Sequence, residues 1–131
     1  MQKISRALAR RRRQSAIVSE MTITIFGAMN RAFARRKNFS GTFEKVLVAM
    51  AISRNDDAGG APLNVASIVR ILNIPRSNAK RATDDLIREG AIRREGAGFT
   101  LDLTYMKQRI DADYFKAMMA AIKKAAADLA S

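Results

Sequence analysis

Five of the six residues that follow Pro75 carry hydrogen-bond donors or positive charge. They are Arg76, Ser77, Asn78, Lys80 and Arg81. Arginine can donate a pair of hydrogen bonds to O6 and N7 of guanine, and asparagine can pair with N6 and N7 of adenine. Ser77, Asn78 and Arg81 are therefore predicted to contact base edges, and Arg76 and Lys80 to contact phosphates. The alternative is an ordinary solvated face of a charged helix.

This chain contains few residues of the types that catalyse reactions. There is no cysteine and no histidine, which excludes disulfides, thiolate nucleophiles, histidine-dependent triads and histidine zinc sites. Asp84 and Asp85 cannot converge on a helix, because adjacent positions point in different directions. Gly59 and Gly60 do not form a phosphate-binding loop, because they are not followed by the Lys and the Ser or Thr that such a loop requires. We expect no enzymatic activity, no metal site and no cofactor.

The charge balance favours a polyanionic partner. The 131 residues include 24 Lys and Arg against 12 Asp and Glu, a net charge of +12. Residues 1–37 hold ten of the cations and a single acid, Glu20. Residues 1–13 are expected to form a basic arm that enters a narrow minor groove or follows the phosphates, with an affinity that falls steeply as salt rises; the alternative is a solvated tail. Ile4 and Leu8 lie four residues apart, so part of the arm could also continue the next helix backwards. The arginines of this arm are Arg10, Arg11, Arg12 and Arg13.

The spacing of apolar residues predicts helices on both sides of the polar stretch. An N-terminal helix is expected over 14–37 and a second one over about 42–54. A short helix follows to residue 72 with Asn64 as its N-cap, and the next runs from 76 to 88 and stops before Gly90. A final helix is expected over 111–130, with Asp111 as its cap.

Between these helices the hydrophobic period changes from that of a helix to that of a strand. Residues 91–94 and 99–103 are predicted to form a small hairpin around a turn at 95–98. Arg93 and Arg94 precede the turn, and at least one of them is predicted to contact phosphates or the minor groove. Their alternative role is to discourage strand pairing at an exposed edge. The fold class is therefore mainly α with a small β-hairpin.

The order of these elements resembles a winged helix-turn-helix DNA-binding domain. The resemblance covers residues 63–103 (LNVASIVRILNIPRSNAKRATDDLIREGAIRREGAGFTLDL), with residues 42–54 as the preceding helix. It implies a winged helix-turn-helix core over 42–103, flanked by N- and C-terminal amphipathic helices. It also implies that the 76–88 helix enters the major groove of double-stranded DNA, with the hairpin as the wing.

The flanking helices resemble those of the MarR group of transcriptional regulators, in which terminal helices form the dimer interface. This resemblance implies a homodimer built on 14–37 and 111–130, which would read two half-sites about one helical turn apart. The Asp-x-Arg wing motif common in that group is absent, since residues 93–96 read RREG. The identity of any small-molecule effector is left open.

Three classes of function fit the sequence. The first is a sequence-specific DNA-binding protein, a transcriptional regulator located in the cytoplasm and associated with the nucleoid. The second is a non-specific nucleic-acid-binding accessory factor of phage or plasmid replication or partition. The third is a protein-docking or peripheral membrane module, because residues 4–36 form a basic amphipathic segment that could lie on anionic lipid. No apolar run reaches the roughly 18 residues of a membrane span, so none is expected.

Overall fold

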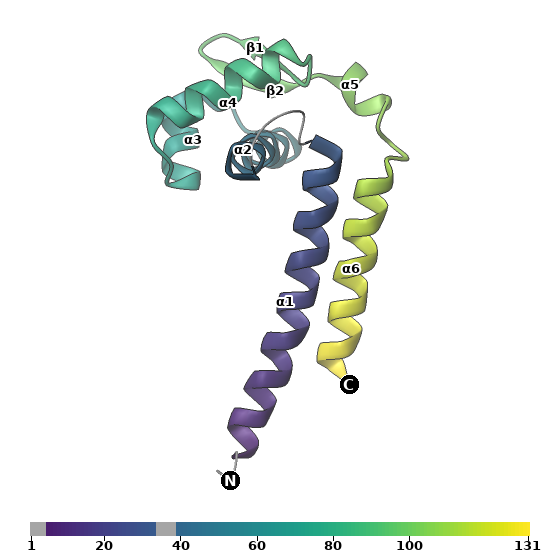
Figure 1. The fold of residues 1–131 in the computed structure, drawn as a ribbon. Coiled ribbons are helices and arrows are strands. Elements are labelled where there is room, and N and C mark those ends of the chain that lie inside the picture. Colours follow the sequence, from purple (N-terminus) through teal and green to yellow (C-terminus); the bar gives the residue numbers. More distant parts are fainter. Residues whose placement is uncertain (1–4, 34–38) are drawn as a thin grey trace. The chain divides into compact units, whose positions relative to one another are not determined.

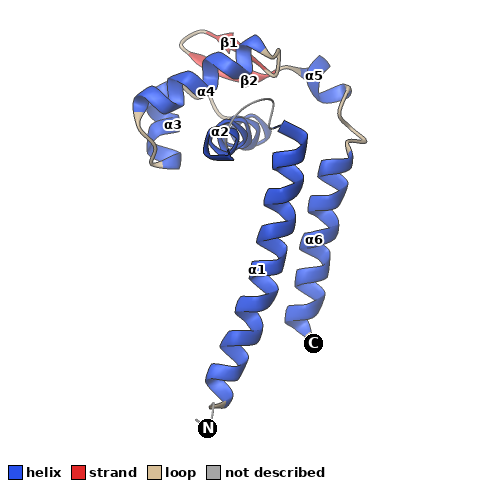
Figure 2. Cartoon of the chain, viewed as in Figure 1, coloured by secondary structure: helices blue, strands red, loops and turns tan. Residues whose placement is uncertain are grey.

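The computed structural model describes residues 5–33 and 39–131. The described chain is mainly helical and has a small antiparallel hairpin, as predicted (Figures 1 and 2). It divides into two units. The first combines both ends of the chain, Met1–Ala32 and Asp111–Ser131, and the second is the continuous segment Phe33–Ile110.

Three helices of the second unit precede the hairpin, and two of them have ends that the sequence marks. The three are α2 (Phe39–Asp57), α3 (Val65–Leu72) and α4 (Arg76–Arg88). The side chain of Asn64 accepts a hydrogen bond of 2.9 Å from the backbone N–H of Ser67, which confirms the predicted N-cap of α3. Gly90 follows α4 with φ of +80°, a conformation that glycine adopts without strain. The predicted bounds of α4 are confirmed.

The hairpin pairs β1 (Ile92–Glu95) with β2 (Gly98–Leu101), and Ile92 lies opposite Leu101. The segment before α3 joins β2 at a single point, because the N–H of Phe99 donates to the carbonyl oxygen of Leu63 at 2.9 Å. This contact brings the backbone so close that a Cβ on Gly98 would lie 2.4 Å from the carbonyl oxygen of Pro62. Only glycine fits at this position without a shift of the backbone.

A short helix that the sequence analysis did not predict follows the hairpin. It is α5 (Leu103–Lys107), and Asp102 caps it by accepting a hydrogen bond of 2.9 Å from the N–H of Tyr105. The guanidinium of Arg109 lies over the ring of Tyr105, with 3.5 Å from its carbon to the ring centroid.

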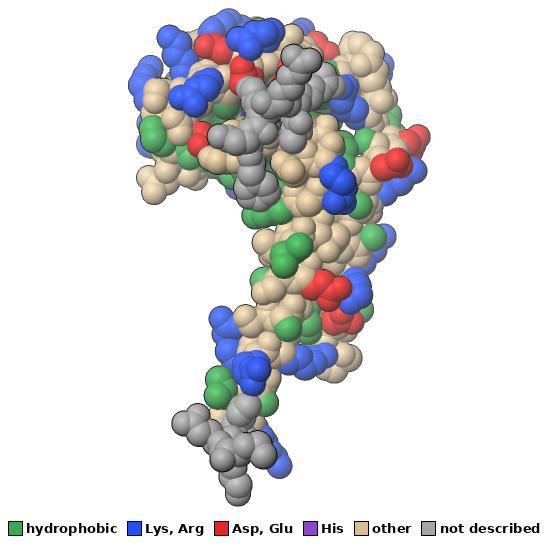
Figure 3. All heavy atoms as spheres, in the orientation of Figure 1, with side chains coloured by type: hydrophobic (Ala, Val, Ile, Leu, Met, Phe, Trp, Pro, Cys, Tyr) green, Lys and Arg blue, Asp and Glu red, His purple; other side chains and the backbone are tan. Residues whose placement is uncertain are grey.

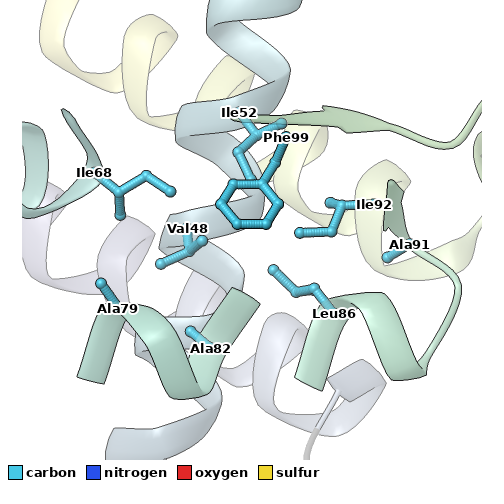
Figure 4. Packing of buried hydrophobic residues seen from close by; sticks show 9 residues of the cluster. All are labelled: Val48, Ile52, Ile68, Ala79, Ala82, Leu86, Ala91, Ile92 and Phe99. Carbon is cyan, nitrogen blue, oxygen red and sulfur yellow. The ribbon is translucent and has the colours of Figure 1, made fainter. Parts of the chain in front are cut away.

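One apolar cluster holds the second unit together (Figure 4). Its buried members are Val48, Ile52, Ile68, Ala79, Ala82, Leu86, Ala91, Ile92 and Phe99. The Phe99 ring lies in the middle of the cluster, among side chains from α2, α3, α4 and β1. Ala79 and Ala82 are small, so α4 can pack closely against the core. Ala79, Ala82 and Leu86 are the members of the cluster that α4 contributes.

A buried ion pair also ties α2 to the end of α4. Lys45 is 3% exposed, and its Nζ lies 2.6 Å from Oε1 of Glu89. A buried ammonium is tolerated only with such a partner, because an unpaired charge in a core is costly.

The first unit consists of α1 (Arg6–Phe33) and α6 (Asp113–Ala130). Arg13 donates from Nη2 to the carbonyl oxygen of Asp128 and to the hydroxyl of Ser131. Further along α1, Glu20 pairs with Lys124 at 3.6 Å. Later residues of α1 thus meet earlier residues of α6, so the two helices run antiparallel. None of the helices described in this chain is both long enough and apolar enough to cross a membrane.

The structure changes two predictions at the chain ends, and a third lies outside the described residues. Residues 6–13 belong to α1 and are not a separate arm, while residues 1–4 lie outside the described part of the chain. Arginine and leucine favour helix formation, and Arg13 is held by α6, so the helix extends back to Arg6. The predicted end of this helix at 34–37 also lies outside the described residues. Asp111 was the wrong cap for the final helix, because Ala112 occupies the N-cap position and provides no side-chain bond.

The ion pairs of Lys124 are on the surface. The hydrogen bond that Lys124 donates to the Asp128 carboxylate and the negative charge of Asp128, together with the charge of Glu20, raise the pKa of Lys124 above its ordinary value of 10.5. Because the folded chain has the higher pKa, these pairs stabilise the first unit fully below pH 10.5. Their contribution is lost as the pH rises through the higher, folded-state pKa.

Candidate nucleic-acid interface

The first half of α4 presents cations to solvent. The helical period buries Ala79 and Ala82 and turns the side chains between them outward. The side chains of Arg76, Ser77, Lys80 and Arg81 are exposed, and that of Asn78 is half-buried. Figure 3 shows Lys and Arg side chains gathered along the edge of the unit that α3 and α4 form.

The three cations of this surface have no acidic partner among the described residues. Arg76, Lys80 and Arg81 form no ion pair within 5–33 or 39–131, whereas Lys45 and Arg88 of the same unit do. Their guanidinium and ammonium groups therefore keep their donors for a ligand. In this arrangement they suit an anionic ligand such as a phosphate backbone.

Asn78 already has hydrogen-bond partners in the protein. Its Nδ2 donates a hydrogen bond of 3.1 Å to Oε1 of Glu44 on α2, and its Oδ1 lies 3.5 Å from Oγ of Ser77. Part of its hydrogen-bonding capacity is thus committed. Sequence reasoning missed Glu44, because nothing in the local pattern shows that a residue of α2 faces the start of α4.

The second half of α4 is neutralised within the protein. Asp85 is buried and accepts a hydrogen bond of 2.9 Å from Arg88, and Glu89 pairs with Lys45. Asp84, which is half-buried, adds a further negative charge on this half of the helix. The cationic surface of α4 therefore ends with Arg81, because the acidic residues that follow would repel phosphate.

The two arginines of the hairpin lie on opposite sides of it, because successive strand residues alternate. Both are exposed. Nε of Arg93 lies 3.8 Å from Oδ2 of Asp102, and the guanidinium carbon of Arg94 lies 5.4 Å from the centroid of the Phe99 ring. Arg94 thus covers the edge of the core in addition to offering its donors to solvent.

The remaining predicted arginines belong to the first unit. Arg10, Arg11, Arg12 and Arg13 are exposed on the first turns of α1. Arg13 is bound to the end of α6, where carbonyl groups lack helical partners and a cation is favourable. The other three form no ion pair with any described residue.

Comparison of the chain with protein-family models, with curated proteins and with solved structures finds no match. The residues and their arrangement are therefore the basis for inferring a function.

Proposed function

We propose that this chain is a sequence-specific double-stranded DNA-binding protein of the winged helix-turn-helix class, and a transcriptional regulator. The observation that carries the proposal is the start of α4, where three cations without acidic partners in the described chain stand beside polar Ser77 and Asn78. A helix of this kind fits the major groove of B-DNA, and its first residues reach the base edges.

The surrounding elements support this class of fold. Helices α2, α3 and α4 share one core, and a tight turn with Asn73 at φ of 53° separates α3 from α4. The hairpin follows α4 directly after Gly90, in the position of a wing. In such domains the helix after the turn reads the DNA while the wing contacts its backbone.

Each predicted residue has a role in this proposal. Ser77, Asn78 and Arg81 contact base edges, and Arg76 and Lys80 contact phosphates. Phosphate contacts are also assigned to the exposed arginines of β1 and of the first turns of α1. These are Arg93, Arg94, Arg10, Arg11 and Arg12, with Arg13 contributing its charge from the end of α6.

A regulator of this kind would act as a homodimer in the cytoplasm, associated with the nucleoid. The helices α1 and α6 are the proposed dimerisation elements, since they lie outside the unit that carries α4. Two copies would then read two half-sites, which raises both affinity and specificity.

Binding without sequence preference is the second candidate function, as in an accessory factor of phage or plasmid replication or partition. The hydrogen bond from Asn78 to Glu44 favours this second function, because it uses a donor of one of the few side chains that could read a base. The concentration of arginines on α1 favours it too, since phosphate contacts carry no sequence information.

Selection from a random duplex library at near-physiological salt separates these functions. Enrichment of one motif is the expected result, and a variant with Arg76, Lys80 and Arg81 replaced by alanine should not enrich it. Salt-dependent binding without any enriched motif would favour the second candidate. Absence of binding to any duplex would overturn both.

A further inference from the structure

A row of apolar side chains on α6 points into solvent. Phe115, Met119, Ile122 and Leu129 are between 39% and 50% exposed. Successive residues of an α-helix are turned by about 100°, so these side chains and exposed Ala126 lie within an arc of about 80°. We call these five residues the apolar row. A continuous exposed apolar surface of this kind marks a place where another molecule binds.

The contact with α1 leaves the apolar row uncovered. Around α6, buried Ala125 and Met118 lie between Lys124, which pairs with Glu20 of α1, and the row. The same order holds around α1, where half-buried residues separate Glu20 from exposed Val18. Because the two helices are antiparallel, this order places Val18 on the same side of the pair as the apolar row.

Lysines border the apolar row on the edge that faces away from α1. Exposed Lys123 and Lys116 lie about 40° and 60° beyond Met119 around α6. Neither lysine forms an ion pair with a residue that the structure describes, whereas Lys124 pairs with two acids. Their ammonium groups are therefore available to a ligand that covers the row.

Arginines extend this pattern onto the first turns of α1. Exposed Arg11 lies between Val18 and Leu8 around the helix, and exposed Arg12 lies about 40° beyond Leu8. Leu8 itself is 49% exposed. Cations thus accompany the exposed apolar side chains on both helices.

The acidic side chains of α1 and α6 lie on other sides of the pair. Glu20 and Asp128 both bond to Lys124, on the side opposite the apolar row. Asp113 lies about 160° around α6 from Phe115. The side that carries the row therefore combines apolar and cationic side chains, and no acid of Arg6–Phe33 or Asp113–Ala130 lies on it.

We propose that this side of the α1–α6 pair binds the surface of an anionic phospholipid membrane. The apolar row enters the boundary between headgroups and acyl chains, and the lysines and arginines beside it contact headgroup phosphates. The sequence alone pointed to residues 4–36 as a basic amphipathic segment, and the structure adds the apolar row and the lysines of α6. Lipid binding is separate from DNA binding, which belongs to the unit that carries α4.

Charge complementarity favours a membrane as the occupant of this side. A second copy can cover the apolar row, as in the homodimer of the proposed function, but it brings no acid to the cations, because this side of the copy has none either. Anionic headgroups supply negative charge at the rim, and long Lys and Arg side chains reach them from the edge of a buried apolar surface. A membrane and a second copy therefore compete for the apolar row.

Two exposed isoleucines give a matched test. Ile122 lies in the apolar row, whereas Ile23, which is 72% exposed, lies about 140° from Val18 around α1. Cosedimentation of the full chain with vesicles of mixed phosphatidylglycerol and phosphatidylcholine, without DNA, measures binding. Ile122→Ser should raise the dissociation constant by roughly tenfold, because less apolar surface enters the membrane. Ile23→Ser should bind like the parent, and vesicles of phosphatidylcholine alone should bind weakly.

Two exposed alanines repeat the test without removing any packed side chain. Ala126 lies in the apolar row and Ala120 lies about 120° away around α6. Ala126→Glu and Ala120→Glu add the same charge, so only the first should lose more binding than one charge explains. Circular dichroism checks that all variants keep the helix content of the parent.

The role of the cations is tested at constant net charge. Replacing Lys116 and Lys123 with glutamine should weaken binding to the mixed vesicles by roughly tenfold or more, because each cation near the surface contributes. Replacing Arg76 and Lys80 with glutamine removes the same charge from the other unit and should weaken binding less.

Several outcomes overturn the proposal. Absence of binding to the mixed vesicles does so, as do equal effects within each pair of variants, because net charge alone would then explain binding. A dimer in sedimentation equilibrium that Ile122→Ser dissociates, with no vesicle binding, would assign the apolar row to a second copy. A chain that binds the vesicles and no duplex would support the membrane proposal and overturn the proposed DNA binding, so the two are distinguishable.

Discussion

Arg81 is an exposed cation one helical turn beyond Ser77 and Asn78, on the outer face of α4. Arg81→Ala should weaken binding to the selected duplex by about 1–3 kcal/mol and relax the preference at one base pair, because a bidentate contact is lost. Fluorescence anisotropy titrations with the selected duplex and its single-base variants measure both effects.

Arg88→Ala is the matched control for this prediction. Arg88 is a cation of the same helix, but it bonds to Asp85 and lies on the neutralised half of α4. Arg88→Ala should leave the preference among base pairs unchanged. If Arg81→Ala and Arg88→Ala weaken binding equally and neither changes the preference at any base pair, α4 contributes only positive charge and Arg81 does not read a base.

Glu44 controls the hydrogen bonds that Asn78 can offer. Glu44→Ala should change the preference at the base pair that Asn78 reads by up to about 1–3 kcal/mol, because the freed amide can then donate and accept together on adenine. The selection experiment, repeated with this variant, measures the change. Asn78→Ala identifies the base pair concerned, and a Glu44→Ala effect at any other position would contradict the prediction.

Among the elements, the hairpin depends most on a single residue, because β2 begins at a glycine that lies against Pro62. Gly98→Ala should destabilise the second unit by about 1–3 kcal/mol, since the added methyl group forces the backbones apart. Urea unfolding followed by circular dichroism measures this change. Ala97→Ser alters the exposed neighbour in the turn and should stay close to the parent; an equal loss would show that the turn, not the contact with Pro62, is responsible.

The elements also show what the sequence could and could not predict. The bounds of α3 and α4 followed from local signals, which were the Asn64 cap, Pro75 and Gly90. The start of α1 had only the weak signal of Ile4 and Leu8 at helical spacing, and the five residues of α5 had none, because α5 is little more than one turn.

The candidate site was predicted only where local sequence patterns determine it. The helical period places Ala79 inward and Arg81 outward, so the exposed cations of α4 could be read from the sequence. Glu44 could not, because its bond to Asn78 joins residues of two different helices. Nor could the use of Arg13 at the end of α6, since only the folded pair of helices brings them together.

At the scale of the whole molecule, the excess positive charge of α1 should appear in the salt dependence of binding. Replacing Arg10, Arg11 and Arg12 with glutamine leaves Arg13 on α6 and the helix intact. If all three neutralise phosphates, the slope of log affinity against log salt should become shallower by up to about 2.7, which is about 0.9 for each contact. Titrations of one duplex at several salt concentrations measure the slope.

Lys116→Gln and Lys123→Gln provide the comparison for the arginine run, because both are exposed cations of the same unit on α6. We expect each of these two substitutions to change the slope of log affinity against log salt less than each arginine substitution does. If the change in slope per removed charge is the same, net charge alone explains the slope and the arginines of α1 make no phosphate contact of their own.

The first unit is assembled from the two ends of the chain, with the second unit in between. When the chain folds, α1 and α6 can meet only by closing a loop that spans the whole second unit, and closing so long a loop costs more conformational entropy than forming short-range contacts. The α4 unit, whose residues are contiguous, can fold before that loop closes. A chain truncated before residue 113 would therefore carry the cationic surface of α4 in folded form, while α1 lacks the helix to which Arg13 and Glu20 bind.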